Sequence, residues 1–97
     1  MAYDPGAIEA ALAAAVGDEP SLMAELRHAF TDSAVRSLRA LEQADSAEAW
    51  RTSAARLRGL AASFGAIRLM ALAAEAADST PCDPAMLGRL RRAVARL

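Results

Sequence analysis

Between positions 51 and 62, arginine side chains surround a set of residues too small to obstruct another molecule. Guanidinium groups are permanently charged and present a planar set of donors that matches carboxylate and phosphate oxygens. Small side chains allow a close approach to the backbone. The arginines are Arg51, Arg56 and Arg58, and the small residues are Thr52, Ala55, Gly59 and Ala62. Such a strip is unusual for a solvent-facing surface, and a partner that approaches closely would explain it.

These residues share one side of a predicted helix. At about 100° per residue, the segment from Glu48 to Phe64 has an apolar face and an opposite face that carries the small residues and Glu48. Ser53 is the one polar residue on the apolar face, where a small side chain whose hydroxyl can bond back to a carbonyl one turn earlier is tolerated. The apolar face consists of Trp50, Ala54, Leu57, Leu60, Ala61 and Phe64. We expect this face to be buried.

Gly59 needs a physical reason, because glycine inside a helix costs about 0.5–1 kcal/mol relative to alanine. One explanation is drift in an alanine-rich chain, or close packing of another helix of the same chain. The other is that a separate molecule approaches the backbone at this point. The spacing of the residues does not decide between the two.

The segment from Ala54 onward resembles the signature of histidine-containing phosphotransfer (HPt) domains. In that family the pattern reads approximately Ala-His-x-Leu-Lys-Gly, followed by Gly-Ala and a leucine. The matching residues are Leu57, Gly59, Gly65, Ala66 and Leu69, with Arg58 in place of the lysine. The stretch from Glu25 to Phe30 is similar to the family's second helix. The phosphorylatable histidine would fall at position 55, which is alanine here.

The resemblance implies a docking face for the receiver domain of a response regulator, or for a histidine kinase. An HPt domain exchanges a phosphoryl group with a receiver aspartate through a solvent-exposed imidazole; the Arg58 guanidinium would supply the nearby cation and Gly59 the room. Ala55 has no lone pair, so we expect no catalytic residue and no phosphorelay through this chain. The implied partner-binding residues are Arg51, Thr52, Ala55, Arg56, Arg58, Gly59, Ala62 and Ser63.

Three interpretations of Ala55 stay open. The chain is a pseudo-phosphotransfer domain that binds a partner without passing phosphate, or an active phosphotransfer protein whose histidine was replaced. The third is a structural or dimerising helical bundle that packs its small residues against another copy. His28, the one histidine, lies on the outward side of its predicted helix, and its neighbours do not reproduce the motif. We therefore interpret it as a surface histidine.

Composition narrows the class of protein. The chain has 97 residues, 55% of them hydrophobic and 4% aromatic, which favours one domain (1–97) of closely packed helices. The net charge is −1 and all eleven basic residues are arginine, so nothing predicts nucleic-acid or membrane binding. Cys82 has no disulfide partner, and we expect no metal and no cofactor. Without a signal peptide pattern, we expect a cytoplasmic protein. The start at Met1 and the end at Leu97 suggest a free-standing protein, and we expect a monomer.

Prolines, glycines and acidic residues predict where five helices begin and end. Starts are expected at Asp4-Pro5, Asp18-Glu19-Pro20, Asp45 with Glu48 in a capping-box-like pair, Ala66, and Asp83-Pro84. Gly17 and Gly65 are expected stops, and the segment Ser79 to Cys82 a break. The expected apolar stripe of the second helix consists of Leu22, Leu26, Phe30, Ala34, Leu41 and Ala44, and the expected inward face of the fourth of Leu69, Leu72 and Ala76. Arg89, Arg91, Arg92 and Arg96 are expected on a solvated face of the last helix. The short connections predict an all-α, up-down antiparallel four-helix bundle, with the short N-terminal helix capping one end.

Overall fold

Five helices account for most of the chain, and the connections between them are short. The computed structural model describes residues 5–17 and 19–97, and within these residues there is no strand. The helices are α1 (Pro5–Val16), α2 (Pro20–Glu42), α3 (Ala47–Ser63), α4 (Ile67–Asp78) and α5 (Pro84–Ala95). The all-α class is therefore confirmed. No helix in the described part of the chain is both long and apolar enough to cross a lipid bilayer.

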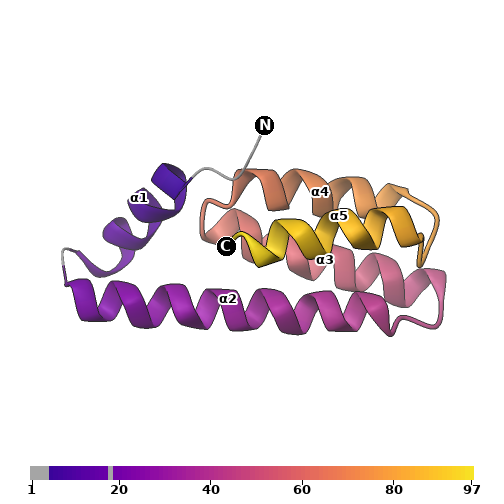
Figure 1. The fold of residues 1–97 in the computed structure, drawn as a ribbon, viewed down its shortest axis with the longest axis horizontal. Helices are drawn as coiled ribbons and strands as arrows, with labels where there is room; N and C mark the ends of the chain where they lie inside the picture. The colour runs from indigo at the N-terminus through magenta and orange to yellow at the C-terminus, as the bar shows by residue number, and fades with distance from the viewer. Residues whose placement is uncertain (1–4, 18) are drawn as a thin grey trace.

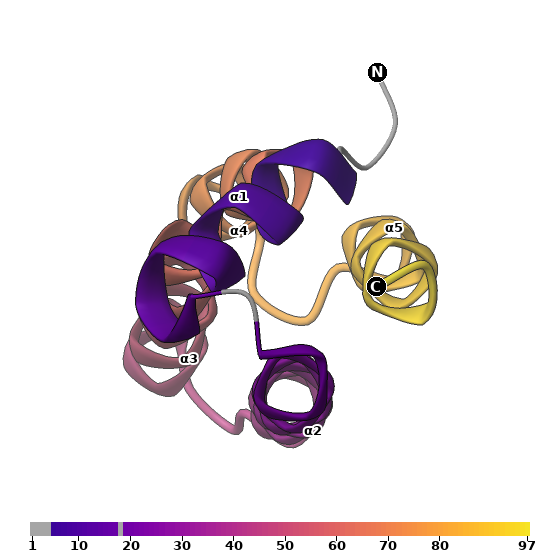
Figure 2. The same cartoon turned by 90° about the vertical axis from the view of Figure 1, so that its left-hand side faces the viewer.

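The helices pack in the order of the chain, and the last also packs against α2. α2 contacts α3, α3 contacts α4, α4 contacts α5, and α5 contacts α2. α2 has 23 residues and is therefore about 34 Å long, most of the 42 Å long axis of the molecule. α1 packs against α2 and crosses the end of the molecule where α2 begins (Figures 1 and 2).

The core is built mostly from alanine and leucine, which allows the helices to approach closely. Trp50 and Phe30 are its largest fully buried side chains, and α1 contributes Ile8 and Leu12, which are also fully buried. The predicted inward residues of α4, Leu69, Leu72 and Ala76, are buried, as are Leu87, Leu90 and Val94 of α5.

Two predictions about α2 need correction. Leu22, expected on the buried stripe, is 45% exposed, because it lies in the first turn of α2, near the end of the molecule. Leu38, which we did not include in that stripe, is buried. The predicted inward residues Phe30, Ala34 and Leu41 are buried as expected.

Helix stops agree with the sequence. Gly17 and Gly65 both have φ of 70°, the left-handed conformation that glycine adopts without steric cost. After α3, the Ala66 N–H donates to the Ala61 carbonyl (2.9 Å) and the Gly65 N–H to the Ala62 carbonyl (3.3 Å). These paired bonds form a Schellman motif, which ends α3 and begins the turn into α4.

The observed helix starts agree less well with those predicted from the sequence. Pro20 and Pro84 lie in the first turns of α2 and α5, and the Asp83 carboxylate accepts from the Met86 N–H (3.0 Å), as predicted. The N-cap of α3, however, is Ser46 and not Asp45, because the Ser46 hydroxyl accepts from the Ala49 N–H (3.0 Å). The predicted capping box is therefore wrong. Asp4 and Asp18 lie outside the described residues.

Candidate functional site

The predicted strip lies on the exposed side of α3. Thr52, Ala55, Gly59 and Ala62 follow one another along the helix, and all four are exposed. We call these four residues the small-residue strip. Arg51, Arg56, Arg58 and Ser63 lie beside it and are also exposed. The eight residues predicted for partner binding therefore come together, since a single helix carries them.

Contacts with α4 and α2 fix which side of α3 faces outward. Trp50 is fully buried, and its indole Nε1–H donates to the Ala76 carbonyl on α4 at 2.6 Å. Beyond the C-terminal end of α3, the Phe64 ring stacks on Phe30 of α2, with 4.6 Å between ring centroids and 20° between ring planes. Leu57, between these two anchors, is fully buried. The helix is thus held on both sides, which leaves the small-residue strip exposed.

Gly59 faces open space. A Cβ atom added at this position would meet no atom of the chain within 4 Å beyond its own helix backbone and neighbours. Close packing of another helix of the same chain therefore does not explain this glycine, and that interpretation is wrong. Drift or approach by a separate molecule are the explanations left.

The three arginines beside the strip are not engaged in ion pairs. Among residues 5–17 and 19–97, no carboxylate lies within 4.0 Å of the Arg51, Arg56 or Arg58 guanidinium groups. Arginines elsewhere do form such pairs: Arg27 with Glu9, Arg89 with Glu75, and Arg91 with Glu42. The charges beside the strip are thus free to meet an anionic group from outside.

Ser63 and Ala55 differ in what they can offer a partner. The Ser63 hydroxyl donates to the Gly59 carbonyl at 3.0 Å, so its proton is already used within the helix. Ala55 presents a methyl group to solvent and has no atom that could accept a phosphoryl group. The site therefore offers unpaired charges and open space, but no nucleophile at the position where the resemblance places one.

His28 and Cys82 lie where the sequence predicted, away from helix α3. His28 is on α2, its side chain is 79% exposed, and its Nε2 is 3.8 Å from an Asp32 carboxylate oxygen. Cys82 is exposed in the connection between α4 and α5, with its thiol donating to the Ala44 carbonyl (3.2 Å). Within the described residues, no three His, Cys, Asp or Glu side chains gather in a way that could hold a metal ion.

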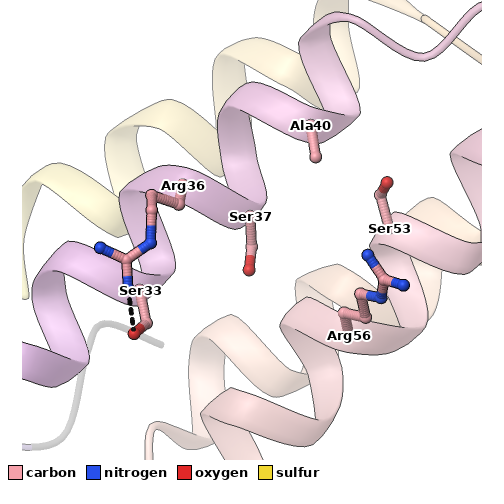
Figure 3. A pocket seen from close by; sticks show the side chains of 6 residues that line it. All are labelled: Ser33, Arg36, Ser37, Ala40, Ser53 and Arg56. Atoms are coloured by element: carbon pink, nitrogen blue, oxygen red, sulfur yellow. Dashed lines mark hydrogen bonds between the residues drawn. The ribbon is translucent and has the colours of Figure 1, made fainter.

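A polar hollow that was not predicted from the sequence lies between α2 and α3. It has a volume of about 290 Å³ and is lined by Ser33, Arg36, Ser37, Ala40, Ser53 and Arg56 (Figure 3). The spacing of Ser33 and Ser37, one helical turn apart beside the buried Ala34 and Leu38, is the signal that could have indicated a polar flank on α2.

Ser53 carries a hydroxyl on the otherwise apolar face of α3. Its hydroxyl makes no hydrogen bond to the carbonyl one turn earlier, or to any other group among the described residues. Thr31 and Ser63 do make such bonds, to the Arg27 carbonyl (3.1 Å) and the Gly59 carbonyl. The back-bond that was open to Ser53 is therefore not made, and its hydroxyl is left facing the hollow.

Comparisons with protein-family models, with curated proteins and with solved structures found no match to this chain. Its function has to be inferred from the residues of α2 and α3 themselves.

Proposed function

We propose that this chain is a docking module of two-component signalling, which binds a receiver domain through α3 and the adjoining side of α2 and does not carry a phosphoryl group. The observation that supports this most directly is Gly59, which faces open space in the middle of an exposed helix. A glycine at this position costs helix stability, and a partner that approaches the backbone would account for it.

The charges near Gly59 support the same proposal. A receiver domain presents an aspartate at its phosphorylation site, and the unpaired guanidinium groups of Arg51, Arg56 and Arg58 can meet such an acidic surface. Residues that rim a docking face mainly steer association and fix its orientation. We therefore expect binding to weaken as the salt concentration rises.

The proposal includes an up-down antiparallel four-helix bundle formed by α2 to α5. Three features support it: the short connections, the packing of each helix on the next, and the packing of α5 on α2. In HPt domains, which this sequence resembles, such a bundle holds the docking helix rigid.

Docking is tested by measuring the affinity of a panel of purified receiver domains by isothermal titration calorimetry. Gly59→Arg places a long side chain on the small-residue strip, and we expect it to weaken binding at least about tenfold by blocking close approach. Ala95→Arg adds the same side chain at an exposed position of α5 and serves as the matched control. Equal affinity of the Gly59→Arg variant and the unchanged chain would show that the proposed face is wrong.

A second candidate is a phosphotransfer protein that has lost its acceptor, and the exposure of Ala55 favours it. Arg58 lies three residues further along α3, so an imidazole at position 55 would have a cation nearby. The test is to install Ala55→His, add a phosphorylated receiver, and look for an acid-labile phosphohistidine. Failure to label, with receiver binding intact, would exclude this candidate and leave the docking module.

A further inference from the structure

The hollow between α2 and α3 carries features that receiver docking does not require. Its walls come from two helices: Ser33, Arg36, Ser37 and Ala40 from α2, and Ser53 and Arg56 from α3. Figure 3 shows the Ser37 and Ser53 side chains extending from facing helices toward the space between them, with the Arg56 guanidinium close to Ser53. Hydroxyl and guanidinium groups thus converge on one hollow.

Ser53 is the most unusual member of this group. The residue is only 8% exposed, and its hydroxyl has no partner among the described residues. No side-chain oxygen or nitrogen in this part of the chain is both fully inaccessible and unpaired, so the Ser53 oxygen can be reached from outside. Access runs through this hollow or through a neighbouring one, which shares Ser53 and Arg56 and is also lined by Glu48. The Ser53 hydroxyl is therefore free to bond to a ligand oxygen in the hollow.

The charged side chains that line the hollow are all positive. Both charged residues that line it are arginines, and no carboxylate does. Arg36 Nη2 donates to the Ser33 hydroxyl oxygen at 3.0 Å, which holds the Arg36 side chain on α2 (Figure 3). The Arg56 guanidinium makes no hydrogen bond or ion pair within the described residues. The lining therefore offers several donors and no negative charge.

We infer that this hollow binds a small oxyanion of the phosphate class, held by the Arg56 guanidinium and the Ser53 and Ser37 hydroxyls. A phosphate group has several acceptor oxygens and a charge near −2 at neutral pH, which suits one guanidinium with two converging hydroxyls better than a carboxylate does. The inference does not depend on receiver docking, because the free anion is the ligand.

The test is a titration of the ¹⁵N-labelled protein with inorganic phosphate, followed by NMR at constant ionic strength. We expect saturable shifts of the Ser37, Ser53 and Arg56 amide signals. Sodium acetate is the carboxylate comparison and glycerol phosphate the phosphomonoester comparison. Tighter binding of glycerol phosphate would identify a phosphomonoester as the ligand, and tighter binding of inorganic phosphate would identify the free ion. Equal binding of acetate, or shifts that do not saturate, would overturn the inference.

Variants locate the site. Arg56→Gln removes the unpaired charge and should weaken phosphate binding about tenfold or more, and Ser53→Ala should weaken it about threefold to tenfold. Arg92→Gln removes an exposed charge from α5, outside the hollow, and should leave the affinity unchanged. If Arg56→Gln and Arg92→Gln behave alike, the anion is attracted only by net charge and the hollow is not a site. Failure of the chain to bind a receiver domain would not affect this test of phosphate binding. Failure to bind phosphate would likewise leave the test of receiver binding unaffected.

Discussion

At the scale of single residues, Gly59 lowers the stability of α3 and keeps its surface accessible. A Cβ at this position meets nothing within 4 Å, so the chain could accept alanine without any rearrangement. The helix would gain from that change because glycine has the greater backbone freedom to lose on folding. In the docking that we propose, helix stability and close approach of the partner therefore oppose each other at this residue.

Gly59→Ala should raise the free energy of unfolding by about 0.5–1 kcal/mol. Urea denaturation followed by far-UV circular dichroism measures this change. Gly65→Ala is the contrasting variant: Gly65 has a φ of 70°, so alanine should lower stability there. Destabilisation by Gly59→Ala would mean that the space around this residue is filled in solution.

Trp50 combines burial with a hydrogen bond, so shortening it should be costly. Trp50→Phe removes the donor to the Ala76 carbonyl and leaves a cavity, and we expect a loss of about 2 kcal/mol or more in the free energy of unfolding. Ser79→Ala is the control, because it removes another donor to the same carbonyl (2.9 Å) from a partly exposed side chain. Comparable losses in the two variants would contradict a special role for the indole.

Periodicity predicted residues that face fully inward or fully outward, such as Leu57 and Ala55. Periodicity did not predict the hydrogen bonding of the Ser53 hydroxyl. A serine in a helix can bond to its own backbone or turn to a neighbouring element, and the choice depends on what that element provides. In this protein the element next to Ser53 is the polar side of α2, which cannot be inferred from the sequence of α3 alone.

At the scale of elements, the ends of the helices follow from local chemistry. Proline starts and glycine stops were predicted well because they depend on the φ angle of one residue. The start of α3 was predicted one residue too early, since Asp45 and Ser46 are both good N-cap residues and only the direction of the chain decides between them. The contacts with α2 and α4 set that direction.

Ser46→Ala should cost about 1 kcal/mol of stability, because the Ala49 N–H loses its acceptor. Asp45→Ala should change stability by less than about half of that. Thermal unfolding of the two variants under identical conditions separates them. If the Asp45 variant is the less stable, the cap assigned to α3 is wrong.

At the scale of the whole molecule, α1 closes the end of the core where α2 begins. Ile8 and Leu12 are fully buried, and Arg27 of α2 forms an ion pair with Glu9 beside them. The order of the helices could be anticipated from their short connections. The hollow between α2 and α3 could not, because it depends on how these two consecutive helices are rotated against each other.

Leu12→Ala should lower the free energy of unfolding by about 2–4 kcal/mol, because it removes a fully buried side chain. Chemical denaturation measures the loss. Leu22→Ala is the matched control, since this leucine is 45% exposed and should cost much less. Equal small effects would mean that α1 does not share the core.

The small-residue strip could also receive a second copy of the chain, and the state of assembly decides this. We expect a monomer, because the strip carries Arg51, Arg56 and Arg58 along its edges, and two copies would bring like charges together. Sedimentation velocity over a hundredfold range of protein concentration tests this expectation. A dimer that Gly59→Arg dissociates would favour self-association over receiver docking.

The position of Trp50 also determines how this protein can be observed. It is the single tryptophan of the chain, fully buried on the side of α3 opposite the strip. Its fluorescence should therefore report the integrity of the core and remain unchanged when a ligand covers the exposed face. Every surface variant can be screened for correct folding by the emission wavelength of Trp50 alone. If the Trp50→Phe variant still folds, a new tryptophan placed on the strip or in the hollow of that variant would supply a separate signal for binding.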